Sequence, residues 1–152
     1  MAKLSVNDKI CVIITSLFGV GFAPLFGGTL ASVVAVAVFL LVKSQFYFSL
    51  ITVFSIILAF ALSGHAEKIW DEKDSKKIVI DDFCGMLVSL LFIPYDMRMV
   101  ACGFVVFRLF DAFKVPPIDR IENLKGAAGV VGDDIAAGLY TLVILHITKL
   151  FI

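Results

Sequence analysis

The sequence predicts an all-α protein: a compact bundle of about six helices, several of them spanning a membrane or embedded in it. Its 152 residues are 61% hydrophobic and only 17% charged, with a mean hydropathy of +1.03. A soluble domain is nearer half apolar and about 25% charged. Six apolar segments alternate with polar or Gly/Pro-rich connections. The windows 67–82 and 108–134 hold ten and nine of the 26 charged side chains, so the charge is segregated from the apolar segments.

The length fits a single domain, residues 1–152. A net charge of zero argues against a nucleic-acid partner. The three cysteines lie in apolar stretches and form no Cys-x-x-Cys pair, so neither a zinc site nor a disulfide framework is expected. The N-terminus imitates a signal peptide, but Asp8 and Lys9 interrupt its basic region, and we expect the chain not to be cleaved there.

The apolar segments define the expected helices in chain order. They cover residues 10–20, 29–42, 46–63, 83–93, 99–113 and 135–151. The first is ambiguous between a span and an interfacial helix, since Asp8 and Lys9 enter it. Segment 46–63 is long enough to span a membrane, which takes roughly 20 residues. Several others are shorter, and we expect them to be short, tilted or packed inside the bundle.

Alternating crossings would bring three polar stretches, 19–28, 64–82 and 108–134, to the same side of the membrane. That side carries eight Lys and Arg residues, against three on the other side. The positive-inside rule then predicts that the charged side is cytoplasmic.

Two aspartate pairs stand where expected helices begin. Asp81 and Asp82 precede segment 83–93, whereas Asp133 and Asp134 follow the glycine-rich stretch GAAGVVG, which is expected to be a loop. Each pair could simply cap a helix, because Asp is favoured at helix N-termini. One carboxylate is enough for a cap, however, and here each expected helix start has two.

Further polar groups are expected on the same membrane face. Arg108 and Asp111 share a helix face that Lys114 extends, although the first two could be a plain intrahelical ion pair. The loop GVGFAPLFGGT offers backbone N–H groups, together with the hydroxyls of Thr29 and Ser32.

Taken together, these residues predict a metal and phosphate site. Carboxylates that converge at a bilayer surface repel one another, and a hard divalent cation, most simply Mg²⁺, would relieve the repulsion. Arg108 and Lys114 would bind phosphate beside it, with Thr29 and Ser32. This combination indicates phosphoryl chemistry. The expected metal ligands are Asp81, Asp82, Asp111, Asp133 and Asp134, and the expected catalytic residues are Asp81, Asp82, Arg108, Asp111 and Asp134.

Four blocks of the sequence resemble the phosphatidylglycerophosphatase A family, in the family's order and over almost the whole chain. They are GVGFAPLFGGTLAS, DSKKIVIDDFCG, FVVFRLFDAFKVPPI and GAAGVVGDDIAAG. The third and fourth blocks are the more specific. Asp82 stands where the family usually has glutamate, which leaves the charge but shortens the side chain. Such departures keep the carboxylate set intact and allow a different substrate preference.

The resemblance implies an all-helical fold with one central helix ringed by others. It implies Mg²⁺-dependent hydrolysis of phosphatidylglycerophosphate to phosphatidylglycerol and phosphate, at the cytoplasmic face of the bacterial inner membrane. The partners would be the lipid substrate and the bilayer, with no nucleic acid and no obligate protein partner. Asp74 also matches the second block, either as a loop cap or as a residue that supports the site.

Alternatives remain open from the sequence. The attack on phosphorus could come from water or pass through an aspartyl-phosphate. The substrate could be another lipid phosphate, such as a polyprenyl phosphate or phosphatidate. A non-enzymatic Mg²⁺-binding or transport protein is a further alternative, but a transporter should place ionisable groups along a mid-membrane path.

Overall fold

The computed structural model describes residues 5–23, 26–72 and 75–151. Within these residues the chain forms seven α-helices and one short 3₁₀ helix, with no strand, which confirms the predicted all-α class. The elements are α1 (Val6–Thr15), η1 (Val20–Phe22), α2 (Gly27–Leu41), α3 (Gln45–Trp70), α4 (Ile80–Ser89), α5 (Met97–Phe113), α6 (Ile118–Glu122) and α7 (Ala127–Lys149).

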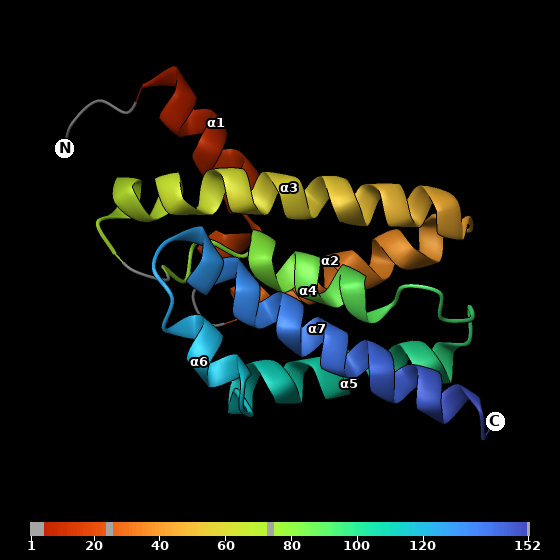
Figure 1. The fold of residues 1–152 in the computed structure, drawn as a ribbon. Coiled ribbons are helices and arrows are strands. Elements are labelled where there is room, and N and C mark those ends of the chain that lie inside the picture. The colour runs from red at the N-terminus through yellow and green to blue at the C-terminus, as the bar shows by residue number, and fades with distance from the viewer. Residues whose placement is uncertain (1–4, 24–25, 73–74, 152) are drawn as a thin grey trace.

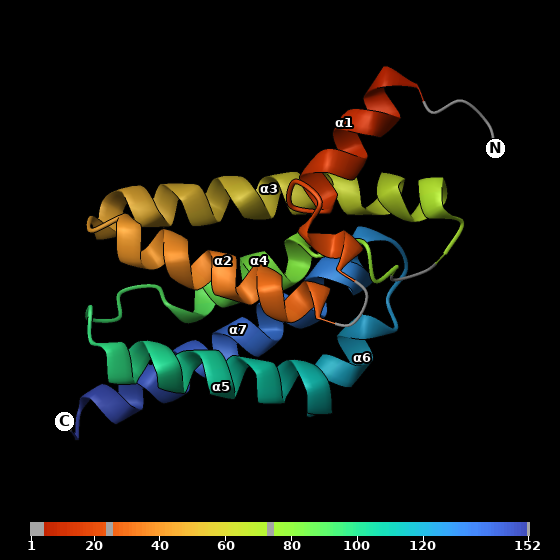
Figure 2. The same cartoon turned by 180° about the vertical axis from the view of Figure 1, so that it is seen from behind.

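Helix α4 is the central helix of the bundle. Nine of its ten residues are buried, and it packs against α2, α3, α5 and α7, which enclose it in both views (Figures 1 and 2). Ten residues of α-helix extend only about 15 Å, half of the roughly 30 Å of a bilayer's hydrocarbon core. The expected segment 83–93 is therefore a helix buried in protein and not a crossing of its own.

Helices α4 and α7 touch through their backbones. A Cβ atom on Gly138 of α7 would collide with the carbonyl oxygen of Gly85 of α4. A Cβ atom on Gly85 would in turn lie 2.7 Å from a ring carbon of Phe107. Only residues without a side chain permit this approach, so the two glycines set the distance between the two helices.

The glycine-rich stretch before Asp133 is helical, and the expectation of a loop there was wrong. Helix α7 begins at Ala127, which places Asp133 and Asp134 in its second turn and away from any N-cap position. The glycines serve close packing: a Cβ on Gly129 would collide with the carbonyl oxygen of Leu124, and one on Gly132 would lie 2.8 Å from the Ile121 side chain. Because glycine also marks loops, the sequence pattern could not separate the two roles.

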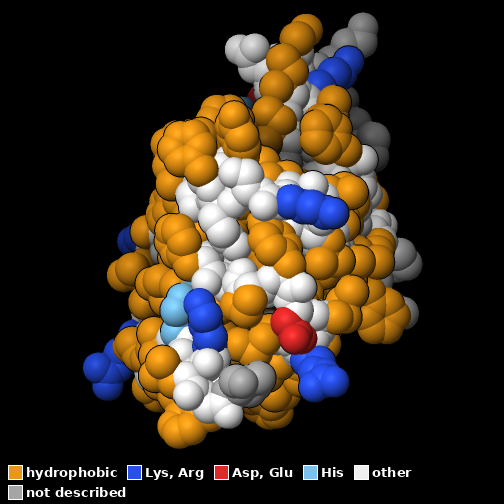
Figure 3. Space-filling model, turned by 90° about the vertical axis from the view of Figure 1, so that its right-hand side faces the viewer, with side chains coloured by type: hydrophobic (Ala, Val, Ile, Leu, Met, Phe, Trp, Pro, Cys, Tyr) orange, Lys and Arg blue, Asp and Glu red, His pale blue; other side chains and the backbone are white. Residues whose placement is uncertain are grey.

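The outer surface of the bundle suits a lipid environment. Helices α3 and α7 are the two described helices that are long and apolar enough to cross a membrane, which agrees with the expected spans 46–63 and 135–151. On α3, large side chains such as Phe54 and Ile57 are more than half exposed. The end of the bundle with the α2–α3 and α4–α5 connections is covered mainly by hydrophobic side chains with few charges (Figure 3).

Replacing Gly138 by alanine should destabilise the bundle. The added methyl group must push α7 away from the Gly85 carbonyl, and overpacking of this kind costs about 1–3 kcal/mol. Thermal unfolding of the detergent-solubilised protein measures the loss. Gly64→Ala is the matched control: it lies within α3, its Cβ would find its nearest neighbour at 3.5 Å, and alanine there should be neutral or stabilising. Equal stability of the two variants would contradict the proposed role of the α4–α7 contact.

Candidate metal and phosphate site

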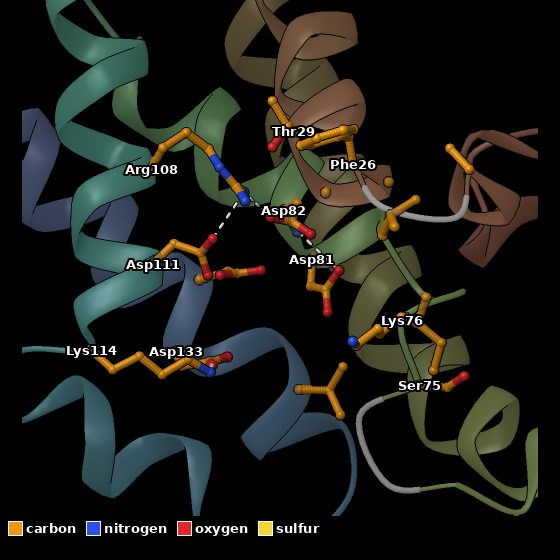
Figure 4. A pocket seen from close by; sticks show the side chains of 17 residues that line it. Phe26, Thr29, Ser75, Lys76, Asp81, Asp82, Arg108, Asp111, Lys114 and Asp133 are labelled. Carbon is orange, nitrogen blue, oxygen red and sulfur yellow. Dashed lines mark hydrogen bonds and ion pairs between the residues drawn. The ribbon is translucent and has the colours of Figure 1, made fainter.

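A cavity of about 340 Å³ opens at the end of the bundle where α2, α4 and α7 begin and α5 ends. Figure 4 shows the side chains of four separate segments converging on it. Eight of the nine predicted site residues line it: Thr29, Asp81, Asp82, Arg108, Asp111, Lys114, Asp133 and Asp134. The fold thus gathers residues that lie up to about a hundred positions apart in the sequence.

Three carboxylates form the centre of the site. Asp81, Asp82 and Asp134 each offer an oxygen within 4.8 Å of the others, a grouping that could hold a metal ion. Asp81 and Asp134 are only 4% and 6% exposed. Both lie one helical turn before the glycines of the α4–α7 contact, so that contact turns them toward each other. Asp111 and Asp133 line the same cavity outside this group of three.

Helix capping does not explain the positions of the aspartate pairs. Val79 is the N-cap residue of α4 and makes no side-chain cap hydrogen bond. Asp81 accepts one first-turn hydrogen bond, from the backbone N–H of Asp82 at 2.9 Å. Asp82 and Asp134 belong with Asp81 to the three-carboxylate group, an arrangement that helix capping does not explain.

Arg108 joins α5 to α4. Its Nη1 atom forms an ion pair with Asp82 and lies 2.9 Å from the Oδ2 atom of Asp111 (Figure 4). The intrahelical pair suggested by the sequence is therefore present, and it extends across to a second helix. Burial and then the negative charge of Asp111 raise the pKa of Asp82 to about 7, although Arg108 opposes this shift.

Lys114 joins the end of α5 to α7. Its Nζ atom lies 2.8 Å from Asp133 and 2.8 Å from Glu122, a partner that the sequence did not indicate. Burial disfavours the charged ammonium, but the hydrogen bonds to both carboxylates outweigh this and raise the pKa of Lys114. The lysine ends α5 in the left-handed conformation, with φ of 42°, which turns the chain toward α6.

The start of α2 forms another wall of the cavity. Gly27, Gly28 and Thr29 line it, and the helix has no side-chain cap, so its first backbone N–H groups and the positive end of its dipole are available to an anion. A Cβ on Gly28 would collide with the Asp82 carboxylate. Only glycine at this position lets the carboxylate lie against the helix start.

Ser32 is the predicted site residue that the fold keeps out of the cavity. Its side chain is fully buried, and its hydroxyl donates to the carbonyl oxygen of Gly28 at 3.0 Å. Ser32 lies one turn after Gly28 on the inner face of the helix. A serine hydroxyl in a helix can donate to the carbonyl oxygen four residues earlier, and Ser32 uses its hydroxyl in this way. Asp74, matched to the family block, lies outside the described residues.

The connection before α4 contributes residues that the sequence reasoning missed. Ser75 and Lys76 both line the cavity, and Figure 4 shows Lys76 directed into it. Their signal in the sequence was their place in the second family-like block, six and five residues before Asp81. The resemblance to that block rests on other residues, so the pattern gave these two no role.

The comparisons with known proteins agree with the resemblance. The profile of the family Phosphatidylglycerophosphatase A matches residues 13–149. A phosphatidylglycerophosphatase A from Escherichia coli is 35% identical over 85% of this chain and 77% of its own length. A Bacteroides thetaiotaomicron protein provisionally named phosphatidylinositol-3-phosphatase is 32% identical over 91% of this chain and 92% of its own. A Haemophilus influenzae phosphatidylglycerophosphatase A is 27% identical over 95% and 91%. No solved structure matches significantly.

Stability should depend jointly on pH and on divalent cations. Without a cation, the folded protein keeps a proton on Asp82 up to about pH 7, whereas the unfolded chain releases it near pH 4. The free energy of unfolding should therefore fall as the pH rises from about 4 to about 7. A bound cation replaces this proton and should raise Tm more at about pH 8 than at about pH 5. Thermal unfolding with EDTA or with a divalent chloride salt tests this; an equal gain at both pH values would argue against a carboxylate metal site.

Proposed function

The chain belongs to the phosphatidylglycerophosphatase A family, and we propose that its cavity hydrolyses the terminal phosphomonoester of phosphatidylglycerophosphate to give phosphatidylglycerol and phosphate. Family membership makes the protein a phosphomonoester hydrolase that acts on a lipid. The observation that carries the assignment to this cavity is the meeting of a three-carboxylate group with Arg108 and Lys114. Carboxylates for a cation, beside positive charges for an anion, are what phosphoryl transfer requires.

Mg²⁺ is the cation that we propose for Asp81, Asp82 and Asp134. All three offer carboxylate oxygens, the donors that hard divalent cations prefer, and the group contains no thiolate or imidazole that would favour a softer metal. Buried carboxylates this close together are stabilised by a nearby positive charge. When bound, Mg²⁺ would act as a Lewis acid toward the phosphoryl group.

Arg108 is proposed to hold the phosphoryl oxygens while it remains in its ion pairs. The guanidinium has five N–H donors, and only Nη1 takes part in its pairs with Asp82 and Asp111. Its other nitrogens can therefore donate to charge that develops on the phosphoryl group. On another wall, the first turn of α2 and the hydroxyl of Thr29 would complete the anion-binding surface.

Asp111 and Asp133 are proposed to handle the proton of the attacking water. Both line the cavity without belonging to the three-carboxylate group. Each lies beside a cation, Arg108 or Lys114, at 2.9 and 2.8 Å, which keeps it oriented. A carboxylate held within reach of the reacting water can accept its proton as a general base.

The cavity is proposed to face the cytoplasm at headgroup level. It lies at one end of α3 and α7, the two helices that are apolar enough to cross a membrane. The polar connections assigned to that end carry eight Lys and Arg residues, against three at the other end. This asymmetry supports a cytoplasmic orientation in the inner membrane.

A second candidate substrate is a phosphoinositide monophosphate. The Bacteroides thetaiotaomicron relative, similar over almost its whole length, is named for that activity. Both lipids present a phosphomonoester on a polar headgroup, so the same chemistry would serve either. Asp82 in place of the family's usual glutamate alters the reach of one ligand, and such a change bears on substrate choice.

Purified protein should release phosphate from phosphatidylglycerophosphate in the presence of Mg²⁺, and EDTA should abolish the release. We expect a lower kcat/KM on phosphatidylinositol 3-phosphate, phosphatidate and polyprenyl monophosphate in the same mixed micelles. A preference for phosphatidylinositol 3-phosphate would show that the second candidate substrate, and not the first, is the correct one. Activity that persists in EDTA after metal removal would contradict the metal-dependent mechanism.

Asp134→Asn should lower kcat by at least about 100-fold with the fold intact, since it removes one charge from the centre of the site. Asp96→Asn is the matched control. Asp96 caps α5 at the opposite end of the bundle, where its Oδ1 accepts from the backbone N–H of Arg98 at 2.7 Å, and asparagine caps equally well. Near wild-type activity of Asp134→Asn would refute the assignment of this carboxylate.

A further inference from the structure

The cavity contains a third cation that neither the family-like motifs nor the proposed chemistry uses. Lys76 lies in the connection that leads into α4, and its side chain is exposed while lining the cavity. Figure 4 shows its amino group directed inward from the side opposite Arg108 and Lys114, with Asp81 and Asp82 between them. The cavity therefore has positive charge on two opposing walls.

Lys76 differs from the other two cations in its interactions. Arg108 is bridged to two carboxylates that line the cavity, and Lys114 is held by Asp133, which lines it, and by Glu122, which does not. Within the described part of the chain, Lys76 takes part in no ion pair. Its charge is therefore available to an incoming anion without breaking an existing contact.

The size of the cavity limits what it can hold. About 340 Å³ is at the lower end of the range of small-molecule sites, roughly 300–1,000 Å³. It can accept a polar headgroup, while the acyl chains must stay outside, against the apolar surface or the bilayer. The headgroup of phosphatidylglycerophosphate carries two anionic groups, the terminal monoester and the phosphodiester next to the diacylglycerol. Phosphatidate and polyprenyl monophosphate carry only a monoester.

We propose that Lys76 binds the phosphodiester of the substrate and so selects lipids whose headgroup carries a second phosphate. This assignment rests on the proposed function, which puts the monoester beside the carboxylates, Arg108 and Lys114. Of the three cations that line the cavity, Lys76 is the exposed one, and it is therefore the one left for the phosphodiester. A phosphoinositide monophosphate also carries a phosphodiester, so Lys76 would serve either candidate substrate but disfavour simple lipid monophosphates.

Soluble analogues of the headgroup distinguish binding of the monoester from binding of the phosphodiester. Glycerophosphoglycerophosphate carries a monoester and a diester, whereas glycerol 3-phosphate carries the monoester alone. As inhibitors of phosphatidylglycerophosphate hydrolysis by the wild type, the first should bind roughly tenfold more tightly than the second, the expected effect of one additional charged hydrogen bond. Lys76→Gln should remove this difference, raise KM for the lipid by a similar factor and leave kcat within about twofold. Lys76→Arg should restore most of the discrimination.

Lys77→Gln is the matched control. Lys77 is the neighbouring lysine, but its Nζ atom lies 3.8 Å from the centre of the Trp70 ring and it does not line the cavity. Its variant should keep the wild-type ratio of the two inhibition constants. The assignment is overturned if the wild type binds both compounds equally, if Lys76→Gln weakens both to the same extent, or if Lys77→Gln has the same effect. A wild-type protein that does not hydrolyse phosphatidylglycerophosphate refutes the proposed function instead.

Discussion

The contact between the backbones of α4 and α7 determines the geometry of the site. Gly85 and Gly138 leave no room for a side chain between the two helices, and the helices run in the same direction through the bundle (Figure 1). One turn before these glycines, Asp81 and Asp134 consequently face each other. A wider spacing would separate the carboxylates, and the oxygen atoms would no longer lie close enough to share one cation.

Grouping carboxylates in a buried site has a cost that the surrounding elements offset. Burial and like charges disfavour ionisation, which is why the pKa of Asp82 is raised. Helix α5 contributes Arg108 from its last two turns and Lys114 from its C-cap. Helix α2 presents an uncapped N-terminus with Gly28 against Asp82. The positive groups come from helices other than those that carry the three central carboxylates. The site therefore connects α5 and α2 to the two helices that carry the carboxylates.

The proposed orientation puts the site where a lipid headgroup would meet the protein. The two helices suited to cross a membrane, α3 and α7, run from the polar end of the bundle to an end covered mainly by hydrophobic side chains (Figures 1 and 3). Helix α4 does not need to cross, because its backbone and side chains are enclosed by protein. A buried central helix can carry charged residues at its start, since neighbouring helices provide the partners that lipid cannot.

The sequence alone determined the helical class, the segregation of charge and almost the whole set of polar residues in the cavity. These depend on hydrophobic content, apolar segment lengths and residue types, which a chain displays before it folds. Only the tertiary structure decided that segment 83–93 is enclosed, that GAAGVVG is helical, that Ser32 points away from the cavity and that Lys76 points into it. Each of these depends on how the helices and connections pack against one another. Glycine marks both a loop and a close helix contact, and a serine or lysine takes its role from the wall it faces, so no local pattern could distinguish the outcomes.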